Sequence, residues 1–290
     1  MLAFVLGGGG GRGALQVGAL RALLEANIRP DLLVGTSAGA TNAALVAVRG
    51  FTPQTLEELE AAWRDAAEAD LLPANYLWLT VRMLFNRPRV QSHHRMRDFF
   101  VTHGLTPELR FADIQGPRLI LVAADLNERR AILYGDDPDQ SVLEGLLAST
   151  TIPPWTHPLE VEDHLLMDGG AVSNLPIEPA LTQGATEVIA LDIADPRVTE
   201  SDAHGFGPFV AKLVATVEQR QLELELALAE ARGVPVHRIV LRAATPVALW
   251  DFSEPDALIA RGYEIARQEI AGWRRDRRAG WRKWLAQLRR

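Results

Sequence analysis

The first part of the chain alternates between short apolar runs and helical patterns. Residues 2–6 and 32–34 are apolar runs of strand length, and each is followed by a glycine-containing turn. Apolar positions then recur at helical spacing over 14–27 and 40–48. This β-α-β-α order predicts a mostly parallel sheet with right-handed crossovers.

The same alternation continues along the rest of the chain. Further strands are predicted at 118–125, 165–167, 187–192 and 236–241, with 130–134 as an antiparallel partner of 118–125, and helices at 53–68, 143–148, 176–182, 206–231 and 254–278. Residues 71–100 are rich in large apolar side chains, and we expect either a helical cap over the site or a plain helical layer on the sheet. Without repeats or low-complexity linkers, residues 1–272 are predicted to form one α/β domain.

Composition narrows the class of protein. The 290 residues are 48% hydrophobic and 23% charged, which is typical of a soluble globular domain with one large core. The absence of cysteine excludes disulfides, cysteine nucleophiles and thiolate metal sites. No apolar run reaches the roughly 18–20 residues that span a bilayer. The apolar start lacks a basic region, so we interpret it as a strand, not a signal peptide, and expect a cytoplasmic protein.

The formal net charge of −7 is unevenly distributed. Residues 273–290 form a tail with eight Lys or Arg and one Asp, so the remaining chain is strongly acidic and nucleic acid is not an expected partner. The tail's apolar residues fall near one helical face: Trp273, Trp281, Trp284, Leu285 and Leu288. Such a helix either contacts an anionic membrane peripherally or packs its tryptophans on the body. Gly280 is expected to interrupt it.

A serine between two glycines stands where strand 32–34 passes into helix 40–48. The run is Gly35-Thr36-Ser37-Ala38-Gly39, and this arrangement is typical of a nucleophile elbow. The turn leaves no room for a Cβ at Gly35 or Gly39, and the helix N-terminus favours negative charge developing nearby. We therefore predict Ser37 as a nucleophile.

A glycine-rich loop follows the first strand. Gly8, Gly10 and Gly13 have the spacing of a dinucleotide fingerprint, but no acidic residue ends the second strand. A phosphate-binding Walker loop is excluded because no Gly-Lys-Ser/Thr follows. What remains is a nest of backbone N–H groups at a helix N-terminus. If the first two strands are adjacent, this nest lies beside Ser37 and can stabilise an oxyanion.

The elbow needs a base, which is usually a histidine late in the chain. Only His204 and His237 follow most of the strands; His204 lies in a polar loop, and His237 lies near the start of a strand, the wrong end for such a site. Asp168 is the better candidate, because it follows strand 165–167 and precedes Gly169 and Gly170. A carboxylate serves as base when it is partly desolvated, hydrogen-bonded to the hydroxyl and coupled to an oxyanion hole.

Together these motifs resemble the patatin-like phospholipase family. The signature blocks are Gly8-Gly9-Gly10-Gly11-Arg12-Gly13, Gly35-Thr36-Ser37-Ala38-Gly39 and Asp168-Gly169-Gly170, and 148–153 and 174–176 are similar to further family blocks. The resemblance covers roughly residues 2–195. It implies a three-layer α/β/α fold related to cytosolic phospholipase A2, with a Ser–Asp dyad in place of a histidine triad.

The resemblance also implies the roles of the residues. Ser37 is expected to be the nucleophile and Asp168 the base in hydrolysis of fatty-acyl esters of lipids, with no metal or cofactor. The glycine loop forms the oxyanion hole through N–H groups around Gly9, Gly10 and Gly11, and Arg12 either holds the loop or faces a phosphate. The alternatives are an acyltransferase of similar fold, although such enzymes usually carry a histidine beside the nucleophile, and a non-catalytic lipid-binding or regulatory protein. Lipid class and oligomeric state do not follow from the sequence.

Overall fold

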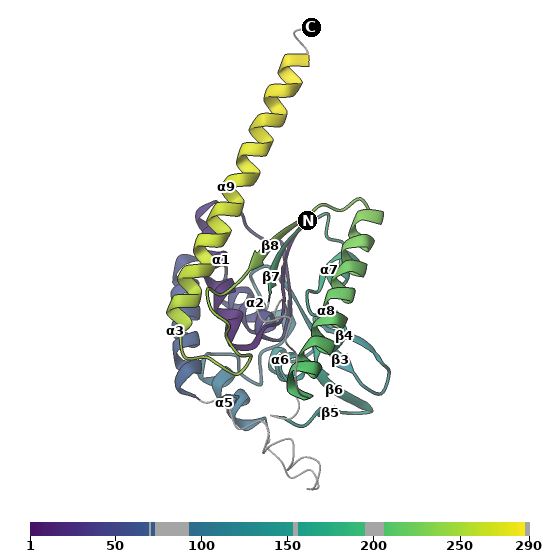
Figure 1. Cartoon of the computed structure of the whole chain (residues 1–290). Coiled ribbons are helices and arrows are strands. Elements are labelled where there is room, and N and C mark those ends of the chain that lie inside the picture. Colours follow the sequence, from purple (N-terminus) through teal and green to yellow (C-terminus); the bar gives the residue numbers. More distant parts are fainter. Residues whose placement is uncertain (70, 73–92, 153–155, 195–205, 288–290) are drawn as a thin grey trace.

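A mixed sheet lies between two layers of helices (Figure 1). The computed structural model describes residues 1–69, 71–72, 93–152, 156–194 and 206–287, and of 206–208, 210–211 and 274–287 it describes only the backbone. Within these residues the sheet has eight strands, in the order β5-β6-β3-β2-β1-β7-β8 with β4 beside β3. The predicted three-layer α/β/α fold is confirmed.

The parallel strands form the centre of the sheet and one of its edges. They are β1 (Leu2–Leu6), β2 (Leu32–Thr36), β3 (Arg118–Asp125), β7 (Glu187–Ile193) and β8 (Val236–Leu241). The antiparallel strands are β4 (Arg130–Tyr134), β5 (Leu159–Val161) and β6 (His164–Asp168). The predicted antiparallel pairing of 130–134 with β3 is confirmed.

Most helices cover one face of the sheet. These are α1 (Ala14–Glu25), α2 (Ala38–Arg49), α3 (Pro53–Glu68), α5 (His94–Thr102), α6 (Val142–Ser149) and α9 (Pro255–Gln287), while α7 (Ile177–Thr182) and α8 (Phe206–Ala231) cover the other face. Thr52 caps α3 as its sequence suggests, because its hydroxyl accepts the N–H of Thr55 at 3.2 Å.

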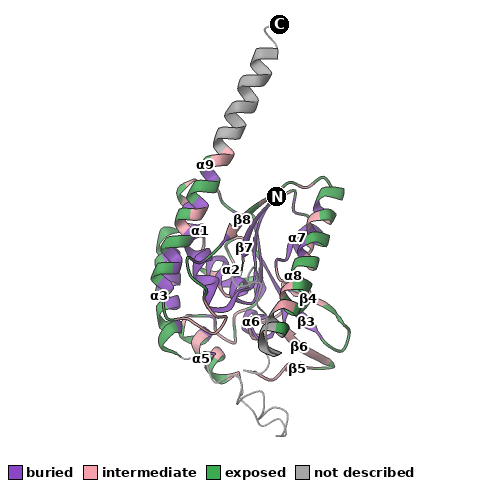
Figure 2. Ribbon diagram, viewed as in Figure 1, coloured by how far each residue is buried: buried purple, intermediate pink, exposed green. Residues whose placement is uncertain are grey.

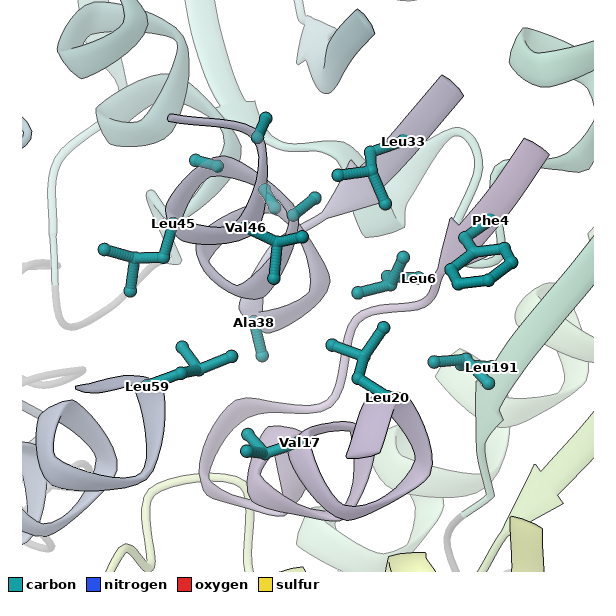
Figure 3. Packing of buried hydrophobic residues seen from close by; sticks show 14 of the residues in the cluster. Phe4, Leu6, Val17, Leu20, Leu33, Ala38, Leu45, Val46, Leu59 and Leu191 are labelled. Atoms are coloured by element: carbon teal, nitrogen blue, oxygen red, sulfur yellow. The ribbon is translucent and has the colours of Figure 1, made fainter. Parts of the chain in front are cut away.

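The core follows from the period of two along the strands. In β1, Phe4 and Leu6 pack toward α1 and α2, whereas Ala3 and Val5 pack toward α7 and α8. Figure 3 shows the hydrophobic cluster on the face of the sheet toward α1 and α2, where side chains of β1, β2 and β7 meet those of the helices. The central strands are therefore buried on both faces (Figure 2).

The last helix, α9, is longer and more continuous than the sequence predicts. Helix α9 continues through Gly280 to Gln287, because a single glycine costs only about 1 kcal/mol in a helix interior. The expected interruption at Gly280 is therefore wrong, and the expected boundary at 272/273 lies inside this continuous helix.

Most of the expected cap at 71–100 lies outside the described residues. Membrane contact by the tail stays a prediction, and none of the described helices has the length and apolar character needed to cross a bilayer.

Candidate active site

Two strands that run in opposite directions meet along one edge of β3. Residues 121–125 of β3 pair with β4, residues 118–122 with β2 and residues 123–125 with β6. A strand has only two edges, so β2 and β6 must share the edge opposite β4. Thr36 of β2 is paired with Val122 and Asp168 of β6 with Ala123, which are consecutive in β3. The ends of β2 and β6 therefore meet, and Ser37 follows Thr36 directly.

The turn at Ser37 has the backbone of a strained elbow. Its φ of 56° and ψ of −124° are unusual for a residue with a side chain and cost about 1–3 kcal/mol. A Cβ at Gly35 would lie 2.5 Å from the carbonyl oxygen of Gly39, and one at Gly39 would lie 2.1 Å from that of Leu6. Glycine is thus a steric requirement at both positions, as the sequence suggests.

The end of α6 and the segment that follows it hold both predicted catalytic residues by their backbones. The N–H of Ser37 donates to the buried hydroxyl of Ser149 at 3.0 Å. The N–H of Asp168 donates to the carbonyl of Thr151 at 2.8 Å. Sequence reasoning assigned neither Ser149 nor Thr151 a role, although both lie in one of the blocks that flank the signature motifs.

Asp168 is a buried carboxylate with one oxygen committed and one uncommitted. Its side chain is 8% exposed, and Oδ1 accepts the N–H of Gly170 at 2.8 Å. Oδ2 is buried and has no hydrogen-bond partner among the described residues. Burial raises the pKa of Asp168 to about 6, while the neighbouring Ser37 hydroxyl and the N–H of Gly170 act in the opposite direction. The Ser37 hydroxyl thus lies near enough to this carboxylate to lower its pKa.

The glycine loop, residues 7–13, already uses some of its N–H groups in backbone hydrogen bonds. Gly8 N–H donates to the carbonyl of Asn174 at 3.0 Å, and Gly11 N–H donates to that of Leu249 at 2.8 Å. The N–H of Arg12 donates to the carbonyl of Gly9 at 3.3 Å. In the described part of the chain, the N–H groups of Gly9 and Gly10 have no acceptor. Of the oxyanion donors expected around Gly9, Gly10 and Gly11, the N–H groups of Gly9 and Gly10 therefore remain as candidates.

Arg12 stabilises the loop with its side chain. Its Nε donates to the carbonyl of Gly9 at 3.2 Å, and the residue is 7% exposed. Of the two roles considered for Arg12, the structure therefore supports the first, in which it holds the loop.

A second layer of contacts fixes the loop that follows Asp168. Thr36 Oγ1 donates to the carbonyl of Ser173 at 2.9 Å, and Ser173 Oγ donates to Glu225 on α8 at 2.5 Å. The same carboxylate accepts the N–H of Glu178 at 2.8 Å, and burial raises its pKa. Glu225 was not singled out from the sequence, because it looks like any other glutamate of a charged helix.

An apolar cavity opens beside Ser37. It encloses about 540 Å³, including space open to solvent. Its walls come from α2, α3, α5, the segment after α6 and a segment that precedes α9: Leu45, Leu59, Ala62, Trp63, Ala66, Met96, Phe99, Phe100, Ile152 and Phe252. Among the described residues that line it, none is charged. Such a cavity suits a hydrocarbon chain.

The histidines considered as bases lie elsewhere. Nε2 of His237 is 3.0 Å from a carboxylate oxygen of Glu187, the first residue of β7, so His237 is at the opposite end of the sheet from Ser37. His204 lies outside the described residues. Across the described ranges, no group of three or more His, Asp or Glu side chains is arranged to hold a metal ion.

Comparisons with known proteins agree with this architecture. The family model Patatin-like phospholipase matches residues 4–181. Patatin-like phospholipase domain-containing protein 6 of Mus musculus is 32% identical over 206 residues, which are 70% of this chain and 14% of that protein. VipD from Legionella pneumophila has a TM-score of 0.53 at 13% identity, covering 93% of this chain and 66% of that chain. Human GIVD cytosolic phospholipase A2, solved with methyl gamma-linolenyl fluorophosphonate, has a TM-score of 0.50 at 10% identity, covering 93% and 57%.

These similarities differ in what they establish. The two solved structures are similar in fold alone, because their sequence identities are low. The chain spans only 14% of the length of the curated relative from mouse. The family model, in contrast, matches more than half of the chain and includes the glycine loop, the elbow and Asp168. The chain belongs to the patatin-like phospholipase family.

Proposed function

We propose that this protein hydrolyses fatty-acyl esters of lipids with Ser37 as nucleophile and Asp168 as general base. The observation that carries the proposal is the meeting of a strained serine with a buried carboxylate whose Oδ2 is uncommitted. With a pKa of about 6, Asp168 is largely ionised at neutral pH yet more basic than an ordinary aspartate. That combination is what proton abstraction from a hydroxyl requires.

The proposed reaction proceeds in two steps. Ser37 Oγ attacks the ester carbonyl carbon while its proton passes to Asp168 Oδ2, and the tetrahedral intermediate then expels the alcohol, which takes that proton. Water next attacks the acyl-enzyme, giving its proton to Asp168. Collapse of the second intermediate releases the fatty acid and returns the proton to Ser37.

The glycine loop would stabilise the negative charge on the carbonyl oxygen. The N–H groups of Gly9 and Gly10 are the candidate donors, because those of Gly8 and Gly11 already donate to carbonyls. The N-terminus of α2 lies directly after Ser37 and adds a favourable field. One such donor typically lowers the barrier by about 3 kcal/mol.

The cavity supports a substrate that places one acyl chain inside the protein. Ser37 lines the cavity together with apolar residues of α3 and α5, so the scissile carbonyl would lie at Ser37 and the acyl chain against those helices. Burying each CH₂ of the chain contributes about 0.8 kcal/mol. The head group or glycerol part would remain outside, where the cavity is open.

Covalent labelling tests the proposal. A long-chain alkyl fluorophosphonate is the probe, chosen because the human structure similar in fold was solved with such a compound. We expect one adduct on Ser37, none in Ser37→Ala, and slowed labelling together with lost ester hydrolysis in Asp168→Asn. Labelling at another residue, or full hydrolysis by either variant, would contradict the assigned roles. Addition of an alcohol or lysolipid acceptor separates hydrolysis from acyl transfer by the products formed.

A further inference from the structure

Three buried polar side chains on three helices form a continuous hydrogen-bond network. We call Gln16 of α1, Asn42 of α2 and Trp63 of α3 the buried amide network. Gln16 and Asn42 are 0% exposed and Trp63 is 6% exposed. Trp63 Nε1 donates to Asn42 Oδ1 at 2.9 Å, and Asn42 Nδ2 donates to Gln16 Oε1 at 2.9 Å. None of these residues carries the chemistry proposed above.

The indole fixes the orientation of both amides. An indole N–H can only donate, so the atom of Asn42 that faces Trp63 must be its oxygen. The Asn42 nitrogen then faces Gln16 and must meet the oxygen of that amide. As a result, the nitrogen of Gln16 is left to donate to backbone carbonyls. Each link depends on the one before it, so the network has a single consistent arrangement.

The network ends on both ends of the glycine loop. Gln16 Nε2 donates to the carbonyl of Gly7 at 2.8 Å and to that of Leu191 at 3.1 Å. Asn42 Nδ2 also donates to the carbonyl of Gly13 at 3.0 Å. The candidate oxyanion donors, Gly9 and Gly10, lie between these two anchor points. Their position therefore depends on two side chains that lie outside the cavity lining.

The other end of the network is a wall of the acyl cavity. Trp63 lines the cavity, and its ring stacks on Phe252 with centroids 6.0 Å apart. The same ring packs so closely on the glycine loop that a Cβ at Gly13 would lie 2.6 Å from it. A side chain that lines the proposed acyl cavity is thus linked, through hydrogen bonds of two amides, to the backbone of the loop.

We propose that the buried amide network is a positioning device that couples occupancy of the acyl cavity to the geometry of the oxyanion loop. The inference rests on the proposed function. An acyl chain that fills the cavity fixes the Trp63 ring, and the network transmits that restraint to Gly7 and Gly13. Long acyl chains then raise kcat and do not only lower KM, because they order the donors used in the transition state.

Chain-length kinetics test the coupling. 4-Nitrophenyl acetate carries only a methyl group beyond its carbonyl, whereas 4-nitrophenyl decanoate offers a nine-carbon chain to the cavity that Trp63 lines. We expect wild type to have the higher kcat with decanoate, and Trp63→Phe and Asn42→Ala to lose that advantage by about tenfold or more, as small misplacements of catalytic groups do. The Asn42→Ala variant is the decisive test. Asn42 does not line the cavity, so it can alter the dependence of kcat on acyl chain length only through the network.

Phe99→Leu is the matched control. Phe99 lines the same cavity from α5 and is outside the network, so we expect a changed KM for decanoate with the wild-type ratio of kcat values. Retention of that ratio in both Trp63→Phe and Asn42→Ala, measured below their melting temperatures, would overturn the coupling. So would loss of the ratio in Phe99→Leu to the same degree.

A second measurement separates this inference from the proposed function. In ¹⁵N-glycine-labelled protein, we expect Trp63→Phe and Asn42→Ala to shift the Gly9 and Gly10 amide signals, and Phe99→Leu to leave them in place. This readout requires no catalysis. If Ser37 proves unreactive while these signals respond, the proposed function fails and the positioning role stands. If Ser37 reacts but neither the signals nor the kcat ratio respond, the inference alone fails.

Discussion

The hydroxyl of Ser149 accepts the backbone N–H of Ser37 at 3.0 Å, and Ser149 is completely buried. The strained turn at Ser37 points this N–H away from the strand ladder of β2. Without an acceptor, a buried N–H costs about 1–3 kcal/mol. Ser149 therefore supports a backbone conformation that the chain would not otherwise adopt.

Removing the Ser149 hydroxyl is expected to lower kcat by more than the accompanying loss of folded protein would explain. We predict that Ser149→Ala lowers kcat about 10- to 100-fold, because a loss of about 1–3 kcal/mol at the elbow displaces the nucleophile. Short-chain ester kinetics together with thermal melting provide the measurement. Ser141→Ala is the control: Ser141 caps the start of the same helix by accepting the Glu144 N–H, at the opposite end of that helix from Ser149. It should lower the melting temperature with kcat intact; equal kcat losses in both variants would contradict the role of Ser149.

The pH dependence of hydrolysis should report Asp168. The base acts when ionised, and burial raises its pKa to about 6. We expect kcat/KM to be level above that pH and to fall about tenfold per pH unit below it. A rate profile with a water-soluble ester, measured where the protein stays folded, checks this. An unchanged rate down to pH 4.5 would exclude Asp168 as the base.

Asp168 is also expected to reduce stability at neutral pH. Its folded pKa of about 6 lies above the ordinary 3.8, so the ionised form is destabilised in the folded state. The cost is on the order of 3 kcal/mol above pH 6 and vanishes as the pH falls below 4, where folded and unfolded chains are both protonated. Asp168→Asn should therefore be inactive but melt at a higher temperature than wild type at pH 8. A lower melting temperature of Asp168→Asn than of wild type at pH 8 would show that the folded protein stabilises the ionised carboxylate.

The glycine loop is expected to reject a side chain at Gly11. A Cβ there would lie 1.9 Å from the carbonyl oxygen of Asp251, so Gly11→Ala must displace the loop or the segment that covers it. We predict at least a 100-fold loss of kcat, since a displacement near 1 Å costs about that much. Gly272→Ala is the matched control: among the described residues, and apart from the helix's own backbone, no atom lies within 4 Å of a Cβ placed there. In helix α9 this substitution should add about 0.5–1 kcal/mol of stability with unchanged kcat.

Glu225 should be replaceable by an amide and not by a hydrocarbon. Glu225→Leu leaves the Ser173 hydroxyl and the Glu178 N–H without their acceptor, at about 1–3 kcal/mol for each buried donor. Because Ser173 is bonded to Thr36, kcat should fall as well. Glu225→Gln removes a buried charge and can keep both contacts, with its oxygen accepting the Glu178 N–H and its nitrogen donating to the Ser173 hydroxyl oxygen. Near wild-type stability is therefore expected at pH 8. Urea unfolding of both variants is the measurement, and equal destabilisation would indicate that the charge itself is required.

The parts of the site that follow from local sequence were predictable. The elbow required glycine at 35 and 39, and the strand before Asp168 could be recognised from three apolar residues followed by two glycines. The buried amide network could not be foreseen, because Gln16, Asn42 and Trp63 each look like ordinary helix residues. Their roles exist only when three helices pack together. The contact between Leu249 and Gly11 was invisible for the same reason, since it joins segments from opposite ends of the chain without any periodic pattern.

That last contact bears on how this protein can be shortened. The family model ends at residue 181, yet Gly7 is bonded to Leu191 and Gly11 to Leu249. A recombinant fragment trimmed to the matched region would keep the serine and the aspartate but lose β7, β8 and the covering segment around Asp251. A fragment that keeps these contacts must therefore extend at least to residue 252, some seventy residues beyond the end of the family model.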